Sequence, residues 1–233
     1  GISPNVVQSK AKVRYVVRDE TTSKMLKLLD RVKKIAKGAA MMTETKVKIR
    51  VLAGVSNLIY NPTLGDVMQR NLELLGPPNF SKDEYIYAEK MQATLSKDDI
   101  KTAFEQAGIE PFNDKPLAVS IVTSNAPATG IAGSTDVADV SWVVPTVQLW
   151  GANYAIGTPF HSWQMTAQGK SSIAIKGMTH AAMVMAATGA DMLLNKTLRK
   201  KAWSDLRRLI GIEGYISPLL KNSKPPIKDM APR

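Results

Sequence analysis

Three short segments of the chain contain residues whose types could bind a substrate or a metal. Asn5 offers an amide donor suited to a developing oxyanion, and Arg18 carries a rigid cationic fork suited to a substrate carboxylate. Residues 130–139, GIAGSTDVAD, combine small residues that let a backbone approach a ligand with hydroxyl and acidic groups. His161 lies in a turn rich in Gly and Pro, where an imidazole is a better ligand candidate than on a helix face.

Each of these segments also has a purely structural interpretation. Asn5 can be a turn residue and Arg18 an ordinary surface residue. Residues 134–139 can be the capped start of a helix, and a single histidine is often structural. His180, inside an apolar segment, is expected to be a core or helix-packing residue. The three segments therefore do not select a function by themselves.

The residue types that are missing restrict the chemistry. The chain has no cysteine, which excludes disulfides, thiolate zinc sites and a cysteine nucleophile. It has two histidines, so a site built on several imidazoles cannot come from this chain alone. The sequence also contains no apolar run long enough to cross a bilayer and opens without a signal-peptide pattern, so a soluble, cytoplasmic protein is expected.

Positive charge is concentrated near the start of the chain. Residues 10–50 hold 13 Lys and Arg against 4 Asp and Glu, within a total net charge of +11. Such a stretch can neutralise phosphates, so a basic nucleic-acid-binding module is one hypothesis. Tyr15 is the only aromatic residue in the segment 5–55, which argues against a sheet that stacks bases. The charges are therefore interpreted as the solvated faces of a helix and two strands.

The periodicity of apolar residues predicts the elements that hold these segments. Residues 5–18 and 45–55 alternate apolar and polar residues as half-buried strands do, and residues 21–40 have helical spacing between them. This pattern predicts part of a small α+β domain over residues 1–57.

The rest of the chain predicts an α/β domain over residues 58–216, followed by a basic, Pro-rich tail at 217–233. Its strands are expected at 117–122 and 141–150. Its helices are expected after Pro62 and at 81–95, 97–108, 171–194 and 196–210.

Taken together, the segments resemble a family of dinuclear zinc hydrolases that includes carboxypeptidase G, the aminoacylases and the bacterial p-aminobenzoyl-glutamate hydrolases. The family shares an Asn turn, a strand that ends in Arg, a G-x-[ST]-D loop and a G-x-x-x-H turn. The corresponding residues here are Asn5-Val6-Val7, Arg18, Gly133-Ser134-Thr135-Asp136 and Gly157 to His161. The resemblance covers nearly the whole chain and implies the C-terminal part of a zinc-peptidase-like α/β catalytic domain with part of a lid domain.

The resemblance also implies roles for single residues. His161 would be a ligand of one of two zinc or manganese ions, near the turn at 134–136, and Asn5 would be a catalytic residue contributed by the lid. Substrate contacts are expected from Arg18, Gly133, Ser134 and Thr135. Asp136 is expected to position these residues without contacting the substrate itself. The lid domain would also pair this chain with a second copy or a different subunit.

The sequence departs from the family pattern in two respects. The H-x-D pair, the Glu-Glu pair and the lid histidine of the family would lie before Gly1. The acidic residue that often follows the metal-binding histidine is replaced by Ser162-Trp163-Gln164. The chain alone is therefore expected to be inactive, with its metal absent or weakly held.

The leading hypothesis is metal-dependent hydrolysis of the amide bond of an N-acyl amino acid such as p-aminobenzoyl-glutamate, as in folate catabolism. This chain would supply one metal ligand and part of the substrate pocket, within a homodimer or heteromer. Neither a membrane nor a nucleic acid is expected as a partner. A non-catalytic dimerisation or regulatory subunit and the basic nucleic-acid-binding module are the alternatives.

Overall fold

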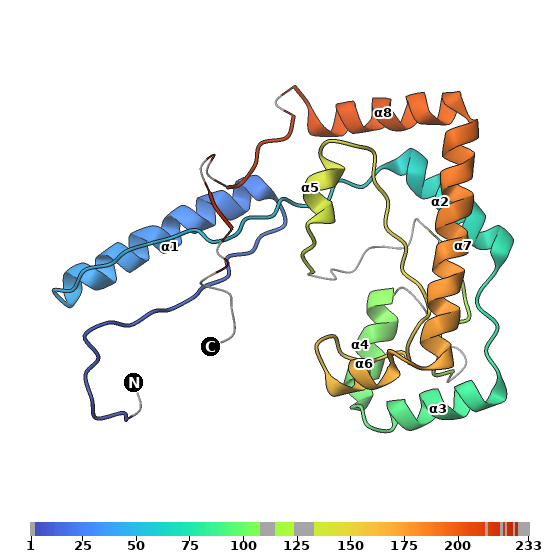
Figure 1. Cartoon of the computed structure of the whole chain (residues 1–233), viewed down its shortest axis with the longest axis horizontal. Helices are drawn as coiled ribbons and strands as arrows, with labels where there is room; N and C mark the ends of the chain where they lie inside the picture. Colours follow the sequence, from blue (N-terminus) through green and yellow to red (C-terminus); the bar gives the residue numbers. More distant parts are fainter. Residues whose placement is uncertain are drawn as a thin grey trace. The chain divides into compact units, whose positions relative to one another are not determined.

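The structure is a computed structural model that describes residues 3–107, 115–123, 133–212, 214–219, 221, 223–225 and 227. By its internal packing the chain divides into two compact units, Leu58–Tyr215 and the combination of Gly1–Asn57 with Ile216–Arg233. Over the described residues both units are built from α-helices and irregular segments (Figure 1). The assignment of one unit as a lid and the other as a catalytic domain stays a prediction.

The first unit is organised around helix α1, Thr22–Met42. The Thr21 side chain caps the helix by accepting a hydrogen bond from the Lys24 amide at 3.3 Å. Asn57 Oδ1 accepts hydrogen bonds from the amide and the hydroxyl of Thr22, both at 3.0 Å, so the segment after the helix returns to its first turn. No residue of α1 is fully buried, so this unit encloses little apolar surface.

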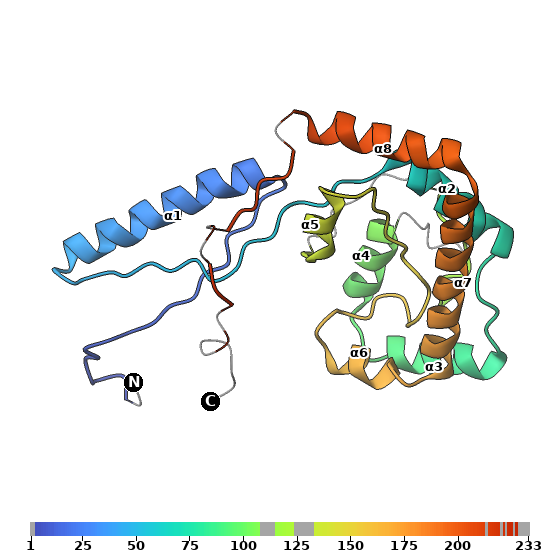
Figure 2. The same ribbon diagram turned by 45° about the horizontal axis from the view of Figure 1, so that its top comes forward.

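Three helices form the frame of the second unit: α2, Pro62–Leu75; α7, Ser172–Leu194; and α8, Lys196–Ile210. They pack on one another through buried side chains that include Val67, Val184 and Leu206. In both ribbon views α8 runs across one end of α7 (Figures 1 and 2).

Two buried side-chain amides link the helices of this frame by hydrogen bonds. The Asn61 side chain caps α2 and also donates to the carbonyl oxygen of Ala202 in α8 at 2.9 Å. Asn71 Nδ2 lies 2.9 Å from Asp191 Oδ2 of α7. Because both amides are buried and hydrogen-bonded, they link the helices without leaving unpaired polar groups.

A second group of buried residues lies near the start of α7. Phe80, Leu117 and Ile173 belong to it, together with Ala88 and Met91 of α3, Lys82–Gln92. Helix α4, Lys97–Ala107, follows α3 in the chain. The group therefore joins α3, the segment at 117 and α7 into one core.

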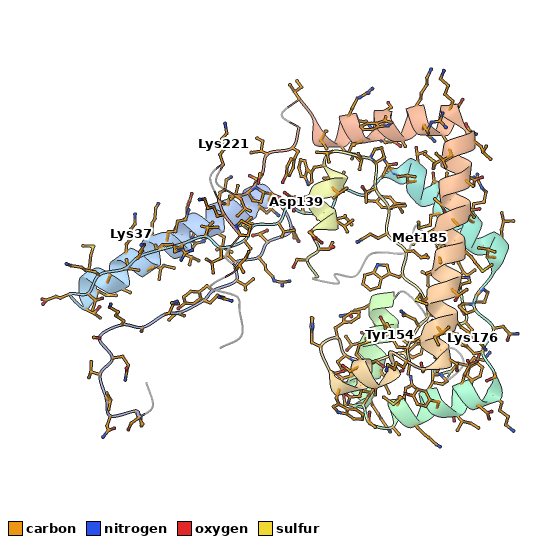
Figure 3. All side chains as sticks on the ribbon, viewed as in Figure 1. Lys37, Asp139, Tyr154, Lys176, Met185 and Lys221 are labelled. Atoms are coloured by element: carbon orange, nitrogen blue, oxygen red, sulfur yellow. The ribbon has the colours of Figure 1, made fainter. Side chains whose placement is uncertain are left out.

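Glu84 connects α3 to α7 through an ion pair. It forms a capping box with Ser81 and accepts a hydrogen bond at 2.7 Å from Lys176 (labelled in Figure 3). Burial raises the pKa of Glu84, but the hydrogen bonds from Lys176, from Ser172 and from the Ser81 amide outweigh it and lower the pKa to about 2.

The prediction of an α/β fold is wrong for the residues that the structure describes, because they contain helices and no β-strand or sheet. The segments expected as strands, 5–18, 45–55, 117–122 and 141–150, lack strand pairing, and the last begins at the end of a helix. An alternating pattern indicates which side of an extended segment is apolar, but a strand also needs a hydrogen-bonded neighbour.

The helices predicted from apolar spacing and capping residues are confirmed, from α1 to α4 and in α7 and α8. The structural interpretation of residues 134–139 as the start of a helix agrees with α5, Val137–Ser141, whereas α6, Trp163–Gln168, was not predicted. His180 is half-buried with Nε2 2.6 Å from the carbonyl oxygen of Gly76, in keeping with a packing role. Among the described residues, no helix combines the length and apolarity that a membrane crossing requires.

Candidate functional site

The candidate site is the turn that carries His161, between residues 155 and 163 in the second unit. Gly157 has a positive φ of 92° and lies against Ile100 of α4. A Cβ atom at this position would be 2.9 Å from the Ile100 Cα, so only glycine permits the approach. The Ile156 amide donates to the Pro116 carbonyl at 2.8 Å, which ties the start of the turn to a distant part of the chain.

Gln168, the last residue of α6, stabilises the turn through hydrogen bonds of its side chain. Its side chain is 1% exposed, and its Oε1 accepts a hydrogen bond from the Ala155 amide at 2.8 Å. Its Nε2 donates to Thr158 Oγ1 at 2.9 Å, and that hydroxyl donates to the Ala155 carbonyl at 2.7 Å. Since every member of this buried network is hydrogen-bonded, the network fixes the turn in one conformation.

His161 is exposed, and its backbone is in the left-handed region at φ 62°. This conformation is uncommon for a residue with a side chain and stores strain of about 1 kcal/mol or more. The next residue, Ser162, caps α6 by accepting from the Met165 amide at 3.2 Å. Among the described residues the imidazole has no hydrogen-bond partner.

Two aromatic rings lie near Phe160, the residue before His161. The Phe160 ring is 6.0 Å from the Tyr154 ring in an edge-to-face arrangement and 6.4 Å from the Trp150 ring, centroid to centroid. Phe160 is 51% exposed and Trp150 62% exposed. Burial raises the pKa of the Tyr154 hydroxyl. We call Trp150, Tyr154 and Phe160 the aromatic cluster (Tyr154 is labelled in Figure 3).

The turn at 133–136 lies just before α5 of the same unit. Thr135 Oγ1 accepts from the Val137 amide at 3.3 Å, whereas Asp136 makes no side-chain cap. Gly133 and Ser134 are exposed. Part of the motif, 130–132, lies outside the described residues.

The structure does not join this turn to His161. The two helices that follow them, α5 and α6, occupy different places in the unit in both ribbon views (Figures 1 and 2). Within the described part of the chain, no hydrogen bond or ion pair links His161 with Ser134, Thr135 or Asp136.

Asn5 and Arg18 belong to the other unit. Asn5 is exposed, and its Oδ1 accepts a hydrogen bond from the Ser3 hydroxyl. Arg18 is also exposed, at the end of an irregular extended segment. Their catalytic and substrate-binding roles stay predictions.

The described residues do not fit a metal ion by themselves. They contain no group of three or more His, Asp or Glu side chains placed to hold one. A stable zinc site uses three or four protein ligands. His161 can therefore be at most one ligand of a site that other residues complete.

Gln168 and the aromatic cluster were not predicted from the sequence. Gln168 is one of several glutamines, and nothing in its local sequence distinguishes a buried network from a surface position. The cluster had a weak signal, since three of the few aromatic residues of the chain occur between 150 and 160.

Comparison with known proteins gives one informative match. No family model and no solved structure matches the chain. The chain is 38% identical over 239 residues to a subunit of p-aminobenzoyl-glutamate hydrolase from Escherichia coli (strain K12). The match covers 98% of this chain and 50% of that protein, so the chain spans about half the length of the curated relative. The resemblance inferred from the motifs is thus confirmed: the chain is, over nearly all its length, a sequence relative of half of a p-aminobenzoyl-glutamate hydrolase subunit.

Proposed function

We propose that this chain is part of an enzyme that hydrolyses the amide bond of p-aminobenzoyl-glutamate. The observation that carries the proposal is the 38% identity over 98% of the chain to a protein named for that activity. In the reaction, water adds to the carbonyl carbon, the C–N bond breaks, and the nitrogen takes up a proton. The products are p-aminobenzoate and glutamate.

We further propose that the enzyme depends on zinc or manganese and that His161 supplies one ligand. An exposed imidazole in a strained, well-fastened turn supports this role, since strain of this kind clusters at functional sites. The other ligands would come from residues beyond those described or from another chain. Asn5 and Arg18 would contact the substrate, as would Gly133, Ser134 and Thr135. Asp136 would position these residues without contacting the substrate itself.

An assembly with another chain is part of the proposal. The relative is named as a subunit. Helix α7 is apolar on nearly all sides, yet Ile175, Met178 and Met185 are more than half exposed (Met185 is labelled in Figure 3). A helix with this composition is normally covered on every side, so the exposed stripe supports a protein partner.

The function can be tested by transplanting the chain. The Escherichia coli protein would be rebuilt with this chain in place of its matched half, and release of p-aminobenzoate would be measured. We expect hydrolysis that a chelator abolishes and that His161→Ala lowers by orders of magnitude. Lys200→Ala, at an exposed position of α8, is the matched control and should retain activity.

Two results would contradict the proposal. A folded chimera without hydrolytic activity would favour the alternative of a non-catalytic subunit. Unchanged activity in His161→Ala would remove the metal-ligand role while leaving the hydrolase function intact.

A further inference from the structure

We propose that the aromatic cluster of Trp150, Tyr154 and Phe160 binds the aryl ring of the substrate's acyl group and so makes the enzyme prefer aromatic over aliphatic acyl groups. The inference deepens the proposed function and rests on it for the identity of the substrate.

The cluster provides an aromatic surface of the kind that binds an aryl group. Phe160 contacts Tyr154 edge to face and Trp150 at a tilt of 46°, so the three rings form a continuous aromatic surface. Such ring pairs contribute attraction beyond their area of contact. More than half of the Trp150 and Phe160 side chains faces solvent, which leaves ring surface available to a fourth ring.

The position of the cluster is the second argument. Phe160 directly precedes His161, so one ring of the aromatic surface and the imidazole belong to the same turn. In an N-aroyl amino acid the aryl ring is bonded directly to the carbonyl carbon that water attacks. A site that binds the ring beside His161 would therefore hold the scissile bond near the imidazole.

The backbone that carries Phe160 is also held in place, which favours specificity. Gln168 and Thr158 fix the turn through buried hydrogen bonds, and Gly157 locks it against Ile100. A ring on a fixed backbone loses less conformational entropy when a ligand binds than a ring on a mobile loop does.

The experiment is ligand titration of the whole chain, followed by NMR of the indole N–H signals of its four tryptophans. The ligands are p-aminobenzoyl-glutamate, p-aminobenzoate and acetylglutamate, which keeps the glutamate but replaces the aryl group. We expect the two aryl ligands to shift the Trp150 signal and acetylglutamate to leave it unchanged. The Trp203 signal, from a residue on α8 that stacks with Arg207, is the internal reference and should stay in place.

Variants then test the cluster without requiring turnover. Phe160→Leu and Trp150→Leu keep apolar volume and should weaken binding of p-aminobenzoyl-glutamate roughly 2- to 10-fold. Trp203→Leu should not weaken it. In the chimeric enzyme, Phe160→Leu should raise KM for p-aminobenzoyl-glutamate and reduce its preference over acetylglutamate, whereas general damage would affect both substrates equally.

The outcomes separate this inference from the proposed function. Aryl ligands that leave Trp150 unshifted, or variants that bind p-aminobenzoyl-glutamate as the parent chain does, overturn the aryl site even if hydrolysis is found. Aryl binding that depends on Phe160 supports the site even if the chimera hydrolyses nothing.

Discussion

Gly177 of α7 lies directly against Ala152 in the segment that leads to the His161 turn. A Cβ atom at Gly177 would be 2.4 Å from the Ala152 carbonyl oxygen and 2.7 Å from the Asn153 Cα. Both neighbours are backbone atoms, which cannot rotate away. The absence of a side chain at Gly177 therefore sets how closely α7 approaches this segment.

Gly177→Ala should destabilise the protein by about 1–3 kcal/mol, because the added methyl group forces backbone to move. Gly189→Ala, on the same helix with nothing within 4 Å of its Cβ position, should stabilise it by about 1 kcal/mol through helix propensity. Urea unfolding of both variants measures the difference. Equal stabilities would show that α7 does not pack against residues 152 and 153 as described.

Glu84 makes stability depend on pH in the acid range. Its pKa is about 2 in the folded chain against an ordinary value of 4.5. A lowered pKa stabilises the fold above the ordinary value and loses that contribution as the pH falls from 4.5 through about 2.

Glu84→Gln should therefore be less stable than the parent chain by about 1–3 kcal/mol at pH 7, since Lys176 loses its charged partner, although a glutamine at this position can still form the capping box. The difference should shrink as the pH falls below 4.5. Urea midpoints of both proteins across this range test the prediction, with Asp83→Asn in the same helix turn as the control. A difference that is constant with pH would contradict it.

Gln168→Leu should destabilise the protein, even though leucine fills the buried space with an apolar side chain. The buried Ala155 amide would lose its acceptor, at a cost of about 1–3 kcal/mol. Gln164→Leu, on the same short helix, is the control, because only its backbone carbonyl takes part in the network. Hydrogen exchange of the Ala155 amide should accelerate in the first variant and stay unchanged in the second.

His161 permits a test that separates strain from function. His161→Gly should be more stable than His161→Ala by about 1 kcal/mol, because glycine adopts a positive φ without steric cost. Both variants lack the imidazole, so both should lose activity in the chimeric enzyme. Thermal unfolding with parallel assays checks this, and a less stable glycine variant would contradict the backbone conformation.

Local signals explain why the helices could be predicted and the sheet could not. Pro62 and Ser81 mark helix starts within their own first turns, so their effect is readable from neighbouring residues. The alternation at Val13 and Tyr15 describes an extended segment, but its pairing depends on residues distant in the chain, and the described residues provide no such pairing.

In the candidate site, the local turn could be predicted from the sequence and its tertiary contacts could not. Gly157 and Pro159 predict a turn at His161, and the residue lies in one. The contact of Gly157 with Ile100 and the network of Gln168 are tertiary, so no local pattern encodes them.

The exposed face of α7 makes the chain sensitive to oxidants. Met178 and Met185, which share one side of the helix, each expose more than half of their side chains to solvent. Peroxide converts accessible thioethers into sulfoxides, which are polar and would disfavour an apolar contact. The sulfur atoms of Met178 and Met185 thus report whether this side of α7 is covered: a bound partner would shield them from oxidation, and prior oxidation would prevent the partner from binding.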